Sequence, residues 1–343
     1  MNYLRIKPLT QYISALGKAS RRAEMRDGAL SYLYSLPTNI PLGEKLSLLG
    51  EKERASLIDG DIVELNEADL LSNPYYRFIE EQKSGFSSIK GFSYAHYEKD
   101  ELFQCGPIRV GKDFETFTRS GYYKTRVKYP IYRLSGRNWM EVIPHEIATM
   151  EGPISLANGK VLVYGLGIGY FPFMVSNKDE VESVTVIEKD DGLAKEFCRQ
   201  LLPLFPNSKK IRIEIGDALG FASSHQGGFD FLFADIYHDE IDGLPLYCKL
   251  KSSEGAARLS AYWIEEEILA YLRRYLIALI EEEYRLGNGD EPYMQCSSEG
   301  DRIFSRLHFL LKGRAIEKPS DIEGLCRDES LRLIASMMGE DGR

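Results

Sequence analysis

The hydrophobic and polar positions change their spacing twice along the chain. Residues 10–83 carry apolar positions at helical spacing, interrupted by prolines and glycines such as Pro37 and Gly50. This pattern predicts several short helices. Residues 90–143 are aromatic and β-branched, in short runs separated by glycine or charged turns. Such runs predict hairpins of a small antiparallel sheet.

From residue 159 onward, short apolar runs alternate with helix-compatible segments. The runs read KVLVY, SVTVI, IRIEI and FDFLFA, and ARLSAYWI follows as a candidate fifth strand. Strands that alternate with helices are typical of βαβ units, in which helices cover both faces of a parallel sheet. We therefore predict an α/β fold with a Rossmann-like, doubly wound parallel sheet.

The segment after the fifth run is strongly helix-periodic. EEEILAYLRRYLIALIEEEYRL places five apolar residues on one stripe, and the following GNG is a helix stop signal. The stripe contains Ile268, Leu269, Leu272, Leu276 and Leu279. Two or three further helices are expected after it. The predicted organisation is a helical N-terminal segment (1–86), a small antiparallel β domain (87–150), a Rossmann-like domain (151–265) and a helical C-terminal extension (266–343).

Glycines or carboxylates follow four successive strands of the predicted sheet. Gly165, Gly167 and Gly169 come after VLVY, Glu188 after VTVI, Asp217 after IRIEIG, and Asp235 after FDFLFA. The carboxyl ends of parallel strands meet at one edge, which is where ligands bind in such sheets. An unpaired carboxylate is costly to bury, so three acids in register behind a glycine turn predict a pocket.

The spacing of the glycines and Glu188 limits the classes of ligand that this pocket could bind. Glu188 follows Gly167 by 21 residues, which matches the acid that receives ribose hydroxyls in nucleotide-binding βαβ units. The loop reads G-x-G-x-G because position 170 is Tyr, and the chain has no G-x-x-x-x-G-K-[ST] sequence. We therefore expect an adenosine ligand whose tail is not a pyrophosphate. The alternatives are a tight βα turn without ligand for the glycines and helix capping for the acids.

These four motifs in order resemble the core of the class I S-adenosylmethionine-dependent methyltransferase superfamily. The resemblance covers residues 159–240 and extends to its polyamine aminopropyltransferase relatives, such as spermidine synthase. It implies S-adenosylmethionine as cofactor, bound by the domain at 151–265. The implied cofactor-binding residues are Tyr164, Gly165, Leu166, Gly167, Gly169, Glu188, Lys189, Asp217, Ala218 and Asp235.

Two features of the sequence favour different branches of this superfamily. The segment IPHEIATMEGPI and the small β domain before it are similar to the layout of the spermidine synthases, and His145 and Glu146 become candidate substrate contacts. Ile168 stands where those synthases usually carry an Asp, and Val163 stands where methyltransferases usually carry an acid. A polycationic amine needs carboxylates around it, so Ile168 favours methyl transfer over aminopropyl transfer.

Three hypotheses follow for function. The first is an enzyme that transfers the methyl group of S-adenosylmethionine by in-line displacement to an unknown acceptor. Asp235, Tyr237 or His238 would orient the nucleophile or accept its proton. The second is a spermidine synthase-like aminopropyltransferase that uses decarboxylated S-adenosylmethionine. The third is a non-catalytic adenosine-binding protein whose helical flanks dock a partner.

Composition limits the remaining possibilities. The 343 residues carry a net charge of −9, and 43% are hydrophobic, which is typical of a globular protein. No apolar run reaches the length of a membrane span and no leader sequence is evident, so we expect a cytoplasmic protein without membrane contact. The five scattered cysteines, including Cys296, predict reduced thiols and no metal site. The oligomeric state is left open by the sequence.

One basic stretch bears on possible partners. Residues 109–137 hold eight Lys or Arg side chains with interleaved tyrosines, a composition that can bind single-stranded nucleic acid. An exposed hairpin face is the favoured interpretation, so nucleic acid is a possible but not a favoured partner. The loop ADIYHDEIDG is likewise interpreted as a solvated acidic loop in preference to a Mg²⁺ site.

Overall fold

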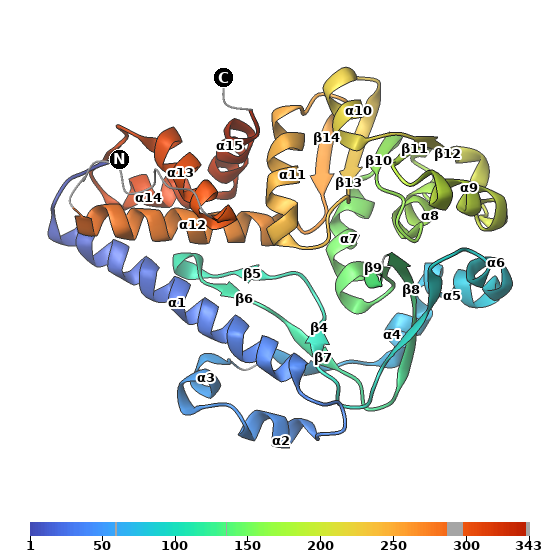
Figure 1. The fold of residues 1–343 in the computed structure, drawn as a ribbon, viewed down its shortest axis with the longest axis horizontal. Coiled ribbons are helices and arrows are strands. Elements are labelled where there is room, and N and C mark those ends of the chain that lie inside the picture. The colour runs from blue at the N-terminus through green and yellow to red at the C-terminus, as the bar shows by residue number, and fades with distance from the viewer. Residues whose placement is uncertain (59, 135, 287–297, 341–343) are drawn as a thin grey trace.

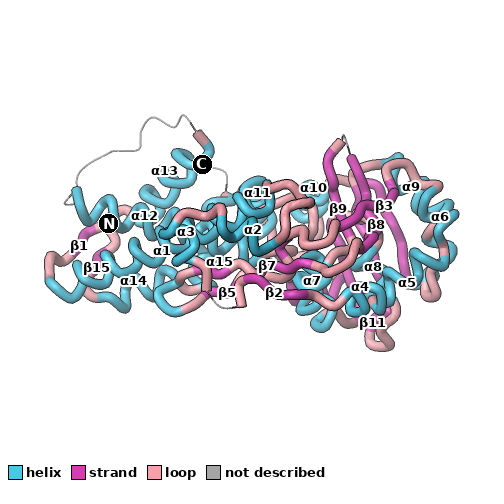
Figure 2. Tube along the Cα trace, turned by 90° about the horizontal axis from the view of Figure 1, so that it is seen from below, coloured by secondary structure: helices cyan, strands magenta, loops and turns pink. Residues whose placement is uncertain are grey.

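The structure is a computed structural model that describes residues 1–58, 60–134, 136–286 and 298–340. A parallel sheet with its helices occupies one end of the molecule, and a layer of long helices extends away from it (Figure 1). Seen from below, the strands gather toward one end and the helices toward the other (Figure 2). The molecule is therefore elongated, with the sheet and the helical layer arranged end to end.

Five strands form one parallel sheet in the order β12-β11-β10-β13-β14. The predicted α/β fold with a Rossmann-like parallel sheet is confirmed, including the fifth strand. The order reverses between β10 and β13, and such a switch point opens a crevice at the carboxyl ends. The strands are β10 (Gly159–Tyr164), β11 (Val181–Glu188), β12 (Ile211–Ile215), β13 (Phe229–Ala234) and β14 (Ala257–Tyr262).

The two central strands are apolar on both faces because both faces are covered. Val161, Leu162 and Val163 of β10 and Phe231 and Phe233 of β13 are buried. The crossover helices are α8 (Tyr170–Ser176), α9 (Asp191–Gln200), α10 (Ala218–Ser224) and α11 (Glu240–Ser252), with short 3-10 turns at Leu202–Leu204 and Ser208–Lys210. Aspartates at 190, 217 and 239 cap α9, α10 and α11, which fixes where these helices begin.

The N-terminal part is helical, as predicted. Its helices are α1 (Lys7–Ser35), α2 (Leu42–Ser47), α3 (Glu51–Ser56), α4 (Glu67–Ser72), α5 (Pro74–Glu81) and α6 (Lys83–Ser87). The strand β1 (Asn2–Tyr3) pairs with β15 (Ala315–Ile316) far along the chain. The N-terminus of the chain is therefore joined directly to the C-terminal helical part, between its helices Glu299–Leu311 and Pro319–Cys326.

The predicted antiparallel strands between residues 90 and 143 are present, but they are divided among three small sheets. These are β2-β7-β4, in which β2 and β7 run parallel, and the antiparallel sheets β3-β8-β9 and β5-β6. The strands are β2 (Ile62–Glu64), β3 (Phe92–Tyr97), β4 (Phe103–Gln104), β5 (Arg109–Val110), β6 (Thr116–Phe117), β7 (Ser120–Tyr122), β8 (Val127–Leu134) and β9 (Arg137–Glu141). A 3-10 turn lies at Lys112–Phe114. The helix α7 (Pro144–Leu156) leads from β9 to the parallel sheet.

The C-terminal part is also helical. It comprises α12 (Glu265–Leu286), α13 (Glu299–Leu311), α14 (Pro319–Cys326) and α15 (Asp328–Gly339). All five residues of the predicted apolar stripe on α12 are buried. The helix α12 lies along α1 (Figure 1). The GNG sequence at 287–289 lies outside the described residues.

One hydrophobic core runs through most of the described chain. It includes Met1, the central strands of the parallel sheet and Met338 of α15. A smaller cluster lies under the loops between α1 and α3. The helical flanks therefore pack against the sheet rather than standing apart from it, and the division into four domains stays a prediction.

Candidate functional site

A cavity of about 490 Å³ opens at the carboxyl ends of the parallel strands. Gly165 and Gly167 line it from the turn after β10, and Glu188, Asp217 and Asp235 line it from the ends of β11, β12 and β13. Two further predicted residues, at positions 189 and 218, also line it. The structure therefore brings together the glycines and acids that the sequence placed at one edge, while their roles stay predictions.

The glycine turn is explained in large part by the packing of the chain itself. All three glycines have positive φ, at 91°, 52° and 86° for Gly165, Gly167 and Gly169. A Cβ at these positions would overlap the Asp235 carbonyl, the Met140 sulfur and the Phe197 ring, respectively. Larger residues are thus excluded even before a ligand enters. Gly169 caps α8 and is not among the cavity-lining residues.

The Glu188 carboxylate is fixed by two backbone N–H groups. Leu166 donates to Oε2 at 2.8 Å, and Asp190 donates to Oε1 at 2.7 Å. A carboxylate offers about four lone-pair positions, so each oxygen can accept one further hydrogen bond. Leu166 itself is buried, and its N–H is its contribution to the site. The end of β11 therefore presents a preoriented double acceptor to the cavity.

Asp217 combines the predicted site position with the alternative capping role. Its Oδ2 accepts a hydrogen bond from Gly220 N at 2.9 Å and so caps α10. Its Oδ1 lies 3.7 Å from Lys189 Nζ, and both side chains are more than half exposed. Such an exposed pair contributes little to stability, so Oδ1 remains available to a hydrogen-bond donor in the cavity.

Behind the cavity, carboxyl groups lie close enough to perturb one another. Burial and the neighbouring Glu188 raise the pKa of Asp235 to about 7. Burial, Asp235 and Glu141 raise the pKa of Glu146 well above its ordinary value. The Oε2 atom of Glu146 is buried without a hydrogen-bond partner in the described chain. This row of acids is an environment that favours a positively charged ligand.

Two of the predicted catalytic residues differ in their placement. Tyr237 is buried, and its hydroxyl donates to the Trp263 carbonyl at 2.6 Å. Its pKa is raised far above the ordinary value by burial and by Asp235, and Tyr237 is not among the residues that line the cavity. The exposed His238 ring instead stacks on Trp139, with 6.2 Å between centroids, beside the cavity.

Two other predicted contacts also lie off the cavity. Tyr164 is 1% exposed, and its ring packs edge-on against Phe221. The Nδ1 atom of His145 lies 3.1 Å from the Gly106 carbonyl, and burial lowers the pKa of this imidazole. Neither residue lines the cavity, and the same holds for Glu146, so their predicted contacts stay predictions. Tyr164 directly precedes Gly165, which does line the cavity, but its own side chain lies in the core.

One wall of the cavity comes from a hairpin that the sequence did not assign to it. Tyr132 and Leu134 of β8 and Trp139 of β9 line the cavity opposite the strand ends. The aromatic richness of this hairpin was visible in the sequence, but its spatial position was not.

The basic-aromatic stretch offers no stacking surface through its central tyrosines. Tyr123 and Tyr129 are buried at 1% and 7% exposure, so their faces are not free to receive bases. The Nζ atom of Lys124 lies 4.7 Å from the centroid of the Tyr122 ring. Lys124 and Lys128 pair with Asp100 and Glu80, respectively. These two outward cations are therefore paired to neighbouring acids, and the role of the stretch stays a prediction.

The cysteines within the described ranges are free thiols. Cys105, Cys248 and Cys326 are buried free thiols and Cys198 is an exposed one, while Cys296 lies outside the described residues. Across the described ranges, no group of three His, Cys, Asp or Glu residues is arranged to hold a metal ion. No described helix is both long and apolar enough to span a membrane.

Comparisons with known proteins point to the same superfamily as the sequence motifs. Over 125 residues, the chain is 34% identical to polyamine aminopropyltransferases of Yersinia pestis (strain Pestoides F) and of Yersinia pseudotuberculosis serotype O:1b (strain IP 31758). The match covers 34% of this chain and 41% of each relative, so it spans about two fifths of the curated relatives. The predicted resemblance to the class I S-adenosylmethionine-dependent superfamily, with the layout of its aminopropyltransferase branch, is confirmed.

Two further comparisons add little to this result. No protein-family model matches the chain. The spermidine synthase of Thermotoga maritima aligns with 15% identity and a TM-score of 0.32, covering 43% of this chain and 58% of the synthase.

Proposed function

We propose that this chain is a transferase that binds decarboxylated S-adenosylmethionine and transfers its aminopropyl group to an amine. The observation that carries the proposal is the placement of Asp235 in the cavity wall beside the glycine turn, in front of Glu146, whose buried Oε2 atom has no hydrogen-bond partner in the described chain. Asp235 raises the pKa of Glu146, and neighbouring acids of this kind are stabilised in their charged form by an added cation. The decarboxylated cofactor has a cationic tail, whereas the tail of S-adenosylmethionine carries an additional carboxylate that these acids would repel.

The proposed adenosine contacts follow the strand ends. Glu188, already fixed by two backbone donors, would accept both ribose hydroxyls through its remaining lone pairs. Asp217 would accept from the adenine amino group through Oδ1. Gly165 and Gly167 would allow the nucleoside to lie against the backbone, and Tyr132 and Trp139 would cover it from the opposite wall. Hydrogen bonds to charged acceptors contribute about 1.5–3 kcal/mol each.

The proposed reaction needs alignment and one proton acceptor. The amine nitrogen forms a bond to the propyl carbon next to the sulfonium, and the carbon–sulfur bond breaks with its electron pair going to sulfur. The products are the lengthened amine and neutral 5′-methylthioadenosine. Asp235 would accept the proton released by the amine, because a pKa of about 7 matches that task near neutral pH.

The position of Ile168 in the structure weakens the argument from the sequence against aminopropyl transfer. Ile168 stands where the synthases usually carry an Asp, yet its side chain is 0% exposed and does not line the cavity. Asp235 lines the cavity instead, and Glu146 and Glu141 lie behind it, close enough for Asp235 and Glu141 to raise the pKa of Glu146. The need of a polycationic substrate for acids can therefore be met without residue 168.

Methyl transfer from S-adenosylmethionine remains the second candidate, and the fixed Glu188 carboxylate favours it equally because both cofactors share their nucleoside. Its acceptor, like the amine acceptor above, is open.

A calorimetric titration distinguishes aminopropyl transfer from methyl transfer. We expect decarboxylated S-adenosylmethionine to bind at least about tenfold more tightly than the carboxylated form, a difference of about 1.4 kcal/mol. Glu188→Gln should weaken binding, while Glu182→Gln, at the exposed start of β11, should leave it unchanged. Mass spectrometry should then detect 5′-methylthioadenosine when putrescine is supplied.

Each alternative outcome has a definite meaning. Tighter binding of the carboxylated cofactor would replace aminopropyl transfer by methyl transfer. Binding without product from any amine or methyl acceptor would favour the non-catalytic hypothesis. If neither cofactor binds, the adenosyl site itself is refuted.

A further inference from the structure

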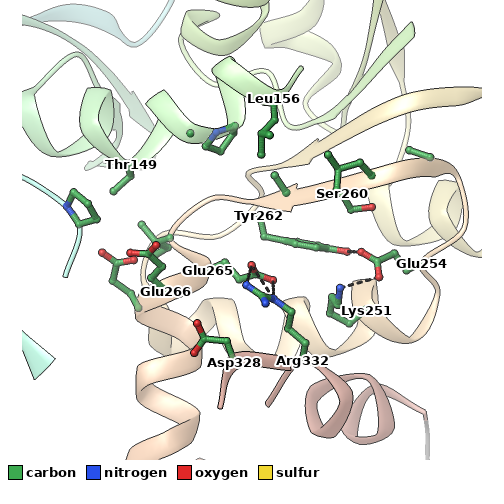
Figure 3. A pocket seen from close by; sticks show the side chains of 18 of the residues that line it. Thr149, Leu156, Lys251, Glu254, Ser260, Tyr262, Glu265, Glu266, Asp328 and Arg332 are labelled. Carbon is green, nitrogen blue, oxygen red and sulfur yellow. Dashed lines mark hydrogen bonds and ion pairs between the residues drawn. The ribbon is translucent and has the colours of Figure 1, made fainter. Parts of the chain in front are cut away.

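The free edge of the parallel sheet lines a second and larger cavity. The strand β14 is the last in the sheet and pairs only with β13 in the described part of the chain. A cavity of about 800 Å³ runs beside it, bounded by α7, the start of α12 and the start of α15 (Figure 3). This cavity is separate from the adenosyl site, because the two share no lining residue.

The lining of this cavity shows that it follows the edge of the strand rather than one of its faces. All six residues of β14, from Ala257 to Tyr262, line it. Because successive side chains of a strand point to opposite faces, a cavity on one face would be lined by alternate residues only. The cavity is therefore a groove along the edge, where every second residue of an unpaired strand presents a backbone N–H and C=O.

One hydrogen bond shows which residues of β14 turn their backbone N–H and C=O groups toward β13 and which turn them toward the groove. Trp263 donates its N–H to the Ala234 carbonyl at the end of β13. Counting back by twos, residues 261, 259 and 257 face β13, and residues 262, 260 and 258 face the groove. The groove therefore holds a ladder of donors and acceptors about six residues long, which at about 3.3 Å per residue spans about 20 Å.

The walls of the groove have an excess of acids. Its cations are already paired, with Lys251 at 2.7 Å from Glu254 and Arg332 at 2.9 Å from Glu265. A third cation, Arg258, lies 3.4 Å from Asp230. Glu266 is exposed and has no ion-pair partner within the described ranges. Figure 3 shows Glu266 on the same side of the groove as Glu265 and Asp328. Asp328 is paired with Arg273 at 2.5 Å, so Glu266 is the one of these three acids without an ion pair in the described chain.

Apolar side chains complete the surface. Leu156, at the end of α7, is 53% exposed, and Leu259 of β14 is 45% exposed, and both line the groove. An extended segment with alternating character could therefore place apolar side chains toward these leucines and basic ones toward Glu266.

We propose that this groove binds an extended, basic segment of a partner protein, which adds to the sheet as a strand beside β14. Main-chain hydrogen bonds to the free edge would supply affinity, and Lys or Arg side chains near Glu266 would supply specificity. A second copy of this chain fits less well, because symmetric pairing of two β14 edges would bring two acid-rich grooves together.

The test uses the full chain and blocked fluorescent peptides of about nine residues, long enough to cover the strand. The first peptide alternates Lys and Val, the second alternates Glu and Val, and the third is the Lys peptide with alternate backbone amides N-methylated. We expect the Lys peptide to bind in fluorescence anisotropy, and the Glu and N-methylated peptides to bind at least about tenfold more weakly.

A matched pair of variants places the binding site. Glu266→Lys should weaken the Lys peptide by about tenfold, whereas Glu329→Lys, on the exposed face of α15 outside the groove, should change it by less than about twofold. Equal binding of the N-methylated peptide would refute strand addition. Absence of binding, or a concentration-dependent dimer in sedimentation equilibrium that excludes the peptide, would refute the basic partner.

Discussion

The hydroxyl of Tyr75 donates a hydrogen bond to the backbone carbonyl of Ile168, inside the glycine turn. Tyr75 is completely buried in α5, 93 residues before the turn in the sequence. From the other side, the N–H of Ile168 lies 3.1 Å from the Met140 sulfur. Both polar groups of residue 168 are thus held by elements outside the parallel sheet, α5 and β9, which fix the shape of the glycine turn.

Tyr75→Phe should therefore weaken binding of an adenosyl ligand. Loss of this hydrogen bond leaves a buried carbonyl without its partner and costs about 1–3 kcal/mol. Tyr76→Phe is the matched control, because Tyr76 is also buried but its hydroxyl donates to Lys128 O at 2.9 Å, away from the turn. Calorimetry should show about three- to tenfold weaker binding for Tyr75→Phe only. Equal losses in both variants would mean that general destabilisation is responsible.

The backbone geometry of the glycine turn leads to a second prediction, which concerns stability. Gly165→Ala should destabilise the fold by about 3 kcal/mol or more, because Gly165 has a φ of 91° and its Cβ would overlap the Asp235 carbonyl. Gly152→Ala, in α7 with open space around it, should be neutral or slightly stabilising. Urea unfolding of both variants measures the difference. A mild effect at Gly165 would show that the turn can relax.

The strands and the acids at their ends could be predicted from local sequence because each depends on local chemistry. Runs such as FDFLFA are apolar on both faces, which only a covered sheet accommodates. The acids at 188, 217 and 235 end such runs, so their common edge followed from parallel topology. The contributions of Tyr132, Trp139 and Tyr75 could not be predicted, because long-range packing leaves no periodic signal. Nor could the local pattern show that Tyr237 and His145 point away from the cavity.

Asp235 should make activity depend on pH. Its pKa of about 7 means that the proton-accepting carboxylate is a minor species at pH 6 and dominant at pH 8. We therefore expect kcat/KM to rise by about tenfold over this range and then level off. Asp235→Asn should abolish most activity. A wild-type profile that stays flat between pH 6 and 8 would contradict the assignment of Asp235 as proton acceptor.

The raised pKa of Asp235 also predicts how the free energy of unfolding changes with pH. Its folded-state pKa, about 7, lies above the ordinary value of 3.8, so ionisation disfavours the folded state as pH rises between these values. Asp235→Asn should thus stabilise the ligand-free protein by about 2–4 kcal/mol at pH 8 and have little effect at pH 4. Asp179→Asn, at an exposed position, should show no such pH dependence in urea unfolding. An equal gain from Asp235→Asn at both pH values would contradict the electrostatic explanation.

The junction between α1 and the small sheets depends on a buried cation. Arg26 is 2% exposed, and it donates to Ser56 O at 2.9 Å, to Thr116 O at 2.8 Å and to Glu115 Oε1 at 2.8 Å. Its Nε also lies 3.5 Å from Asp61 Oδ2, and Asp61 is 1% exposed. Removing this guanidinium would leave the Ser56 and Thr116 carbonyls without this donor. It would also take away the buried cation beside Asp61 and Glu115, which would keep only the Ile58 N–H and Arg22, respectively, as donors in the described chain.

Arg26→Met should accordingly cost about 3–5 kcal/mol, the range for a buried ion pair that loses one partner. Arg21→Met is the control, because the Arg21–Glu281 pair, at 2.8 Å, is largely exposed and should contribute less than about 1 kcal/mol. Urea unfolding followed by circular dichroism compares the two variants with the parent. Since α1 also packs along α12, the Arg26 variant should lose both helical flanks in one transition. Two separate transitions would show instead that the flanks fold independently of the junction at Arg26.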